Sequence, residues 1–227
     1  MATKQKPAPK KRILIVDDHP MMREGLANLI GNQPDLEVCG EAETAAQALE
    51  LLESSKPDVV LVDITLPGKS GLELVKDITA MHPGVATLVV SMHDESVYAE
   101  RVLRAGGRGY IMKREGGKRI LAAIRKILAG EVAVSEKMSA KILQIFSGHR
   151  SEASESPIEQ LTDREFEIFQ LIGRGESTRE IGEKLHVSAK TVEVHRVHIK
   201  EKLRIKTAAE LISYAARWAV NRSQSGE

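Results

Sequence analysis

The chain has 227 residues, of which 42% are hydrophobic and 29% are charged, and its formal net charge is +1 at pH 7. This length favours two domains, and this composition excludes an intrinsically disordered protein. No apolar run approaches the roughly 20 residues of a membrane span, and the single cysteine, Cys39, excludes an intrachain disulfide, so we expect a globular protein of the cytoplasm that contacts no membrane.

Charge is unevenly distributed along the chain. Residues 1–12 carry five Lys or Arg and no acid, whereas residues 13–129 carry 17 acids against 13 Lys or Arg. Residues 188–206 hold six Lys or Arg against two Glu. An acidic first part and a locally basic second part indicate different partners, and nucleic acid is a candidate partner for the second part.

Residues 13–129 alternate short apolar runs with amphipathic segments. Pro20 suits the first turn of a helix, and Pro83 stops another helix. Strands are expected at 13–16, 36–39, 59–62, 87–90 and 110–112, followed in turn by helices at about 20–30, 45–53, 72–81, 95–105 and 118–128. This alternation predicts an α/β domain with a five-stranded, doubly wound parallel sheet.

Polar residues stand where the expected strands end. Asp17 and Asp18 follow the first strand, and Asp63 follows the third. Ser91 ends the fourth strand and Lys113 follows the fifth. The carboxyl ends of parallel strands lie at one edge of a sheet, so these residues should converge. Any one of them alone is better explained as a capping or loop residue, but their joint placement favours a site.

The chemistry of these residues indicates phosphoryl transfer. Three neighbouring carboxylates repel one another unless a cation lies among them, and oxygen ligands without His or Cys favour Mg²⁺. Lys113 would neutralise phosphate charge, and the Ser91 hydroxyl would donate to an oxygen. A flavin-binding domain is the weaker alternative, because the chain has neither a phosphate-binding loop after the first strand nor a G-x-G-x-x-G motif.

The pattern becomes purely helical in the second part of the chain. Helices are expected at 162–172, 177–185, 188–203 and 207–220, after a polar stretch at 147–156. The second and third of these helices are joined by a short turn, which indicates a helix-turn-helix. We therefore divide the chain into a flexible basic tail (1–12), the α/β domain (13–130), a linker (131–157) and an all-α domain (158–227).

Residues 13–129 resemble the flavodoxin-like receiver domain of two-component response regulators. The resemblance rests on V-D-D at 16–18, D-x-x-x-P-x-x-x-G at 63–71, Ser91 and G-Y-x-x-K at 109–113. It implies that a sensor histidine kinase phosphorylates Asp63. The implied Mg²⁺ ligands are Asp63, Asp18, Asp17 through water, and the backbone carbonyl of Thr65.

The same resemblance assigns the residues that respond to phosphorylation. It implies that Ser91 moves toward the phosphoryl group, that Tyr110 follows inward as the switch aromatic, and that Lys113 pairs with the phosphate. Phosphatases of the haloacid-dehalogenase type also phosphorylate an Asp, but they carry a second Asp two positions later. Thr65 stands at that position, which argues against an enzyme that turns over external substrates.

Residues 158–222 resemble the LuxR-type DNA-binding domain, and the whole chain resembles NarL/FixJ-type response regulators. The motifs are L-T-x-R-E at 161–165, E-I-x-x-x-L-x-V-S at 180–188 and T-V-x-x-H at 191–195. The resemblance implies that helix 188–203 enters the DNA major groove. Base-facing residues would be Glu193, Val194 and Val197, and phosphate contacts would come from Lys190, Thr191, Arg196 and Lys200.

The expected function is phosphorylation-controlled transcription regulation. The expected partners are a sensor histidine kinase and double-stranded promoter DNA, with RNA polymerase as a further candidate. Helix 207–220 would either form a homodimer on activation or pack as ordinary core. A dimer would read half-sites about 34 Å apart. The alternatives are a regulator that acts by protein contact with little DNA affinity, and an aspartyl-phosphate phosphatase.

Overall fold

The computed structural model describes residues 9–140 and 157–224, with the backbone alone at residues 159 and 221–224. The chain divides into two compact units, residues 1–140 and 141–227. Residues 1–8 of the expected tail and residues 141–156 of the expected linker lie outside the described residues. Among the described helices, none has the length and apolar character needed to cross a membrane.

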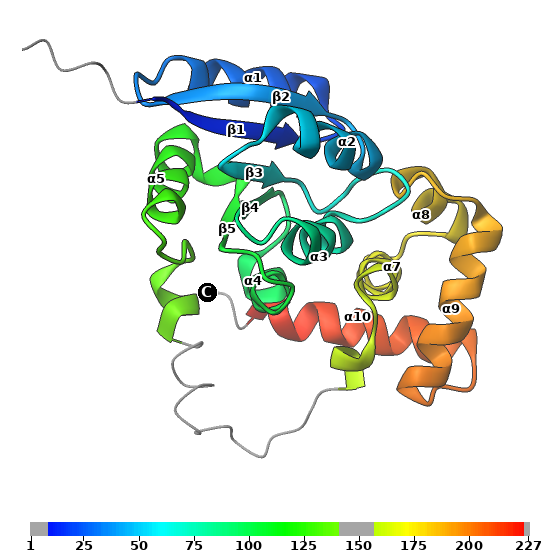
Figure 1. The fold of residues 1–227 in the computed structure, drawn as a ribbon. Helices are drawn as coiled ribbons and strands as arrows, with labels where there is room; N and C mark the ends of the chain where they lie inside the picture. The colour runs from blue at the N-terminus through cyan, green and yellow to red at the C-terminus, as the bar shows by residue number, and fades with distance from the viewer. Residues whose placement is uncertain (1–8, 141–156, 225–227) are drawn as a thin grey trace, which may run out of the picture. The chain divides into compact units, whose positions relative to one another are not determined.

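The first unit is built on a five-stranded parallel sheet, which confirms the predicted fold class (Figure 1). The strand order is β2-β1-β3-β4-β5. Both β1 and β3 lie inside the sheet, which explains why their sequences are continuous apolar runs. The strands are β1 (Lys11–Val16), β2 (Leu36–Ala42), β3 (Val59–Val62), β4 (Ala86–Ser91) and β5 (Gly109–Met112).

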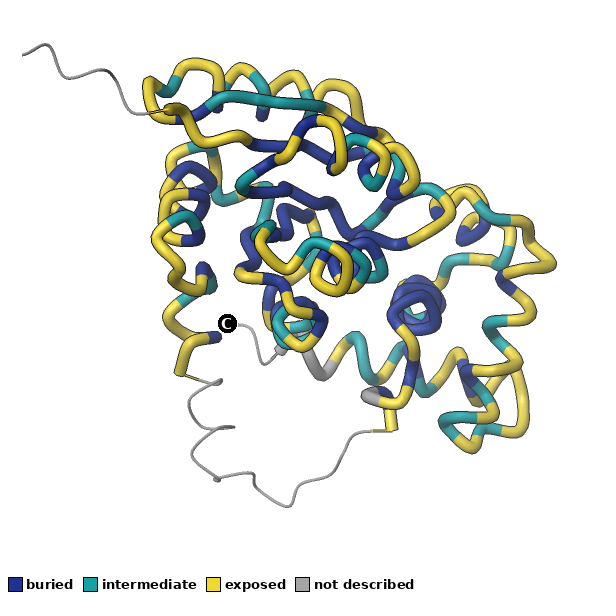
Figure 2. Tube along the Cα trace, in the orientation of Figure 1, coloured by how far each residue is buried: buried dark blue, intermediate teal, exposed yellow. Residues whose placement is uncertain are grey.

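Helices cover both faces of this sheet. Leu26 of α1 and Ile124 of α5 pack with Ile13 and Leu61 in one apolar cluster on one face, while α2, α3 and α4 lie side by side in sequence order. Figure 2 shows the central strands buried and the outer helix surfaces exposed. The helices are α1 (Pro20–Gly31), α2 (Ala45–Ser55), α3 (Gly71–Met81), α4 (Glu95–Arg104) and α5 (Gly117–Leu128), with a 3₁₀ turn η1 (Lys113–Glu115) before α5.

Residues 131–140, which were expected to begin the linker, pack on the first unit. Ala133 forms a parallel bridge to Gly109, and the Tyr110 amide donates to the Ala133 carbonyl at 2.8 Å. The Ser135 amide donates to Glu95 at 2.7 Å, and Met138 is buried. Because β5 is an edge strand, its unpaired backbone groups accept this segment. Local composition did not reveal that contact.

The second unit is helical and has its own core. Capping boxes begin two of its helices, through Thr162 with Glu165 and through Ser177 with Glu180. The Trp218 ring packs edge-on against Phe166, with the ring centroids 5.6 Å apart. The elements are η2 (Pro157–Gln160), α7 (Asp163–Gly173), α8 (Thr178–Lys184), α9 (Ala189–Leu203) and α10 (Ala208–Gln224).

Candidate functional site

The ends of β1 and β3 bring two carboxylates together. Val16 and Val62 are register partners in the parallel pair, so Asp17 and Asp63 leave neighbouring strands at the same level. The Asp63 amide donates to the Val16 carbonyl at 2.8 Å, which continues the ladder into the site. Both Asp side chains are buried.

Lys113 lies between these carboxylates. Its Nζ is 2.6 Å from Asp17 Oδ2 and 2.7 Å from Asp63 Oδ2, and its side chain is only 7% exposed. The other Asp63 oxygen, Oδ1, accepts the Ile64 amide proton at 2.7 Å. A buried charge is tolerated only when it is paired, so the ammonium and the two carboxylates depend on one another.

Burial and neighbouring charges shift the pKa values of Asp63 and Lys113. Burial raises the pKa of Asp63 to about 6; Lys113 opposes this shift and the Asp17 carboxylate adds to it. Burial alone would lower the Lys113 pKa, but the attraction of Asp63 and Asp17 outweighs it and the net shift is upward. Burial, with a smaller contribution from the Asp17 carboxylate, therefore outweighs the lysine at Asp63, and a cation bound beside Asp63 would favour its ionised form.

The donor set at this edge fits a hard cation. Asp17, Asp18, His19 and Asp63 each offer an atom within 4.8 Å of the others. His19 was not singled out from the sequence, although it follows the two aspartates directly; its Nδ1 lies 2.6 Å from Asp18 Oδ1. The His19 side chain is two-thirds exposed and contacts Asp17 and Asp18 from the solvent side. The three carboxylates are the oxygen ligands that Mg²⁺ prefers.

Ser91 and Tyr110 meet at the loop that follows β4. Ser91 is fully buried, and its hydroxyl accepts the His93 amide proton at 3.3 Å. Tyr110 is also buried, and its hydroxyl donates to the His93 carbonyl at 2.8 Å. Burial raises the pKa of Tyr110 above its ordinary value, so the phenol stays protonated and remains a donor.

Thr65 reaches the same loop through its side chain. Its hydroxyl lies 3.1 Å from His93 Nε2, so the loops after β3 and β4 are joined by a side-chain hydrogen bond. Sequence reasoning missed His93, because only the fold brings residues 28 positions apart into contact. The predicted ligand role of the Thr65 carbonyl stays a prediction.

Gly71 sets the close approach of α3 to the loop that follows Asp63. A Cβ at this position would lie 1.9 Å from the Asp63 carbonyl oxygen, and the Gly71 amide donates to the Ile64 carbonyl at 2.8 Å. Any larger residue would push α3 away from Asp63. The glycine that ends the D-x-x-x-P-x-x-x-G motif is therefore explained by packing.

The second candidate site is the outer surface of α9. Ser188 caps this helix by accepting the Thr191 amide proton at 3.0 Å, and Val192 and Ile199 face the core. Val194 and Val197 are instead 47% and 45% exposed, so this face of α9 presents two apolar side chains to solvent. The other predicted DNA-contacting residues, Lys190, Thr191 and Glu193, are exposed, and Arg196 and Lys200 are partly buried.

Two of these side chains already have partners within the unit. The Thr178 hydroxyl donates to Glu193 Oε1 at 2.7 Å and accepts a hydrogen bond from Arg196 at 2.8 Å. Thr178 is on α8, so this network joins the two helices of the helix-turn-helix. Sequence reasoning treated Glu193 and Arg196 as free to face DNA and missed Thr178.

Two families match these two units. The family described as response regulator receiver domain matches residues 13–125, and the family described as bacterial regulatory proteins, luxR family, matches residues 159–215. The oxygen regulatory protein NreC of Staphylococcus carnosus (strain TM300) is 35% identical over 210 residues, which cover 91% of this chain and 97% of that protein. The chain belongs to the NarL/FixJ-type two-component response regulators.

Solved response regulators share the fold. A LuxR-family two-component response regulator from Aurantimonas sp. SI85-9A1 is 35% identical with a TM-score of 0.56, and the match covers 61% of this chain and 99% of that one. RcsB from Salmonella enterica serovar Typhimurium, solved bound to promoter rprA in the presence of phosphomimetic BeF3-, is 23% identical with a TM-score of 0.60. That match covers 92% of this chain and 99% of RcsB.

This response regulator is thus a DNA-binding transcription regulator with a receiver and a helix-turn-helix domain. Within its receiver, the structure brings Asp17, Asp63 and Lys113 into direct contact. Ser91 and Tyr110 are linked to each other through the His93 backbone. The roles assigned to these residues remain predictions.

Proposed function

We propose that a sensor histidine kinase phosphorylates Asp63 in a Mg²⁺-dependent reaction, and that phosphorylation controls promoter binding and transcription. The observation that carries this proposal is the position of Lys113 Nζ between Asp17 and Asp63 at hydrogen-bond distance from both. A buried carboxylate at a strand end, beside a lysine and a second carboxylate, is suited to accept a phosphoryl group and the metal that accompanies it.

The residues of the site would have different roles in phosphoryl transfer. Asp17, Asp18, Asp63 and the Thr65 carbonyl would hold Mg²⁺, which supplies charge neutralisation on the phosphoryl oxygens. An Asp63 carboxylate oxygen attacks phosphorus, and the bond from phosphorus to the kinase imidazole nitrogen breaks, with the electron pair going to that nitrogen. Lys113 then pairs with the new phosphate.

The loop around His93 would carry the signal. The Ser91 hydroxyl would donate a hydrogen bond to a phosphoryl oxygen. This movement of Ser91 would shift the His93 backbone, whose amide now donates to the same hydroxyl. The Tyr110 hydroxyl donates to the His93 carbonyl, so a shift of that backbone would change the position of the tyrosine side chain. Phosphorylation would thereby bias a receiver with two states.

The DNA-binding proposal rests on the exposed face of α9. Val194 and Val197 would contact thymine methyl groups, and Glu193 would accept from a cytosine amino group. Glu193 must then exchange its bond with Thr178 for a base. The phosphate contacts are proposed to come from Lys190, Thr191, Arg196 and Lys200, in a homodimer formed on activation.

Labelling with radioactive acetyl phosphate tests the phosphoacceptor. The native chain should incorporate one phosphoryl group with Mg²⁺ and none with excess chelator, and Asp63→Asn should incorporate none. Asp58→Asn is a matched control, because that carboxylate pairs with Lys11 at the surface. Labelling of the Asp63→Asn variant would refute the assignment.

A mobility shift on genomic fragments tests the output. Phosphorylated protein should bind specific fragments more tightly than unphosphorylated protein. Equal and weak binding by both forms would favour a regulator that acts by protein contact. Repeated turnover of a small phosphate ester would instead favour the phosphatase alternative, which the threonine at position 65 disfavours.

A further inference from the structure

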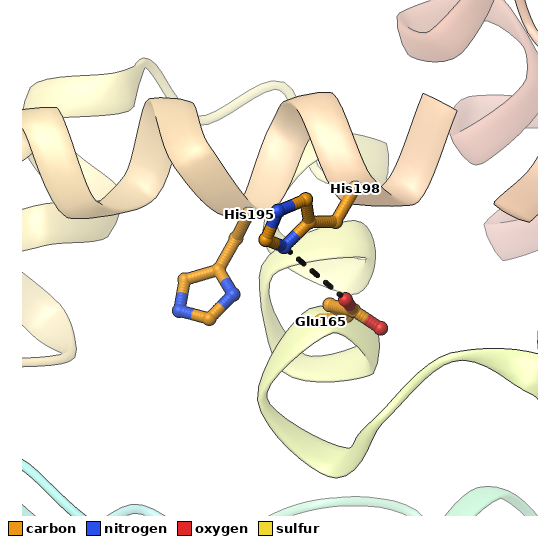
Figure 3. A group of neighbouring side chains, drawn as sticks. All are labelled: Glu165, His195 and His198. Atoms are coloured by element: carbon orange, nitrogen blue, oxygen red, sulfur yellow. Dashed lines mark ion pairs between the residues drawn. The ribbon is translucent and has the colours of Figure 1, made fainter. Parts of the chain in front are cut away.

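A second cluster of metal-binding side chains lies in the helix-turn-helix unit. Glu165 of α7 and His195 and His198 of α9 each offer a ligand atom, and these atoms all lie within 4.8 Å of one another. Figure 3 shows both imidazoles on the side of α9 that faces Glu165, with an ion pair between His198 Nδ1 and Glu165 Oε1 at 3.8 Å. Nothing in the proposed phosphorylation mechanism uses these residues.

The Glu165 carboxylate has one oxygen committed to the fold and one directed toward the histidines. Oε2 accepts the Thr162 amide proton at 2.8 Å and pairs with Lys202 at 2.6 Å. These contacts keep a buried carboxylate ionised and fixed in position. Oε1 is the oxygen that lies nearest to His198.

The two histidines are placed as a chelating pair. They are three positions apart on α9, so they lie on the same side of the helix. His195 is partly buried, while the His198 side chain is 51% exposed and has room to change rotamer. Zn²⁺ bonds nitrogen at about 2.0–2.1 Å in tetrahedral sites, so the ligand atoms must close to about 3.3 Å apart.

We propose that Glu165, His195 and His198 form a site for one divalent transition-metal ion of the zinc type, with water completing the coordination. Imidazole nitrogen selects zinc, copper or nickel over magnesium, so this site, with two imidazoles and one carboxylate, differs in kind from the three carboxylates at the receiver edge. The ion would tie α9, the helix proposed to read DNA, to α7. Metal binding would therefore raise the stability of the unit.

Cobalt(II) is the probe, because its visible absorption reports coordination by nitrogen ligands. The full chain, without a polyhistidine tag, is titrated in the presence of excess Mg²⁺ to fill carboxylate sites. We expect one cobalt ion per chain, displaced by Zn²⁺, with a rise in melting temperature. Substituting a residue that only supports a metal ligand lowers metal affinity by at least about tenfold. Removing a ligand itself should cost at least as much, so His195→Ala and His198→Ala should each lower cobalt affinity by about tenfold or more.

Matched variants separate this site from a second histidine of the same unit and from Asp63 of the receiver. His186→Asn removes an exposed imidazole in the same unit, and asparagine tolerates its backbone φ of 52°; it should bind cobalt like the native chain. Asp63→Asn should also bind normally, so failure of the phosphorylation proposal would leave this one intact.

A variant that gains an absorption band distinguishes loss of a metal ligand from loss of folding. His198→Cys keeps a ligand at a half-exposed position, so it should retain cobalt and add thiolate charge-transfer absorption. Absence of stoichiometric cobalt binding, or binding that survives both alanine substitutions, would overturn the proposal. Absence of the new absorption in His198→Cys while cobalt remains bound would overturn it as well.

Discussion

Lys113 and Asp63 are 50 residues apart in sequence, yet the Lys113 ammonium lies 2.7 Å from Asp63 Oδ2. The contact forms because β3 and β5 are parallel strands of one sheet, and each residue directly follows its strand. The same ammonium contacts Asp17, so a single buried cation serves two buried carboxylates. A substitution of Lys113 therefore changes the surroundings of both carboxylates.

Lys113→Ala should destabilise the receiver strongly in Mg²⁺-free buffer. The substitution leaves Asp17 and Asp63 buried without their cation, which costs about 3–5 kcal/mol in free energy of unfolding. Urea denaturation measures the loss, and Mg²⁺ should restore part of it. Lys69→Ala, which removes an exposed ion pair with Asp77, should change stability by less than about 1 kcal/mol. Equal losses in the two variants would contradict this account.

Asp63→Asn should stabilise the Mg²⁺-free receiver at neutral pH. The Asp63 pKa is about 6 in the fold against 3.8 for the free side chain, so between these values the folded state binds more protons and stability falls as pH rises. A shift of about 2 pKa units corresponds to roughly 3 kcal/mol as an upper bound. The gain from asparagine should be fully present above pH 6 and vanish below pH 4.

Urea unfolding of both proteins across this pH range tests the linkage. Asp58→Asn is the control of opposite sign. Burial raises the Asp58 pKa, but the Arg12 amide and Lys11 outweigh it and hold the pKa below its ordinary value. Its carboxylate therefore stabilises the fold at neutral pH, and that contribution disappears as pH falls through the lowered pKa. A gain from Asp63→Asn that stays constant with pH would be inconsistent with a raised Asp63 pKa.

Tyr110→Phe should uncouple the switch while sparing phosphorylation. It removes the 2.8 Å hydrogen bond to the His93 carbonyl without changing the ring, so the expected cost is about 1–2 kcal/mol in stability. Acetyl phosphate labelling should be retained, because the tyrosine hydroxyl bonds to the loop after β4 whereas the transfer is proposed to occur at Asp63. DNA affinity should respond less to phosphorylation. Loss of labelling in a folded variant would assign Tyr110 to the chemistry instead.

Gly71→Ala should displace α3 from the Asp63 loop. The new methyl group meets the Asp63 carbonyl oxygen at 1.9 Å, and overpacking of this kind costs about 1–3 kcal/mol. Gly25→Ala is the matched control, because that glycine lies inside α1 and a methyl group added there would meet nothing within 4 Å. It should stabilise the receiver by about 0.5–1 kcal/mol. Thermal denaturation of the pair should therefore show shifts of opposite sign.

Lys190→Ala should weaken DNA binding by a similar factor at every sequence. A phosphate contact adds affinity without reading bases, so the slope of log K against log salt should fall by about 1. Val197→Ala should instead weaken binding only at preferred sequences, because it removes a base contact. Lys137→Ala, an exposed lysine of the first unit, is the control. An unchanged salt slope in Lys190→Ala would refute the docking of α9.

The sequence predicted the elements where local signals suffice. The run Val59–Val62 is a buried strand because both faces of a central parallel strand are covered, and that needs only apolar residues. The start of α1 was also readable, since Pro20 suits the first turn of a helix. The strand-end rule then placed Asp17, Asp63 and Lys113 at one edge.

Only the tertiary structure decided which side chains touch across elements. The Thr65 bond to His93, the Glu193 bond to Thr178 and the packing of residues 131–140 on β5 join segments that no local pattern pairs. The cluster of Glu165 with His195 and His198 is of the same kind. Periodicity determines which face of an element is buried, whereas contacts between elements depend on how the whole chain packs.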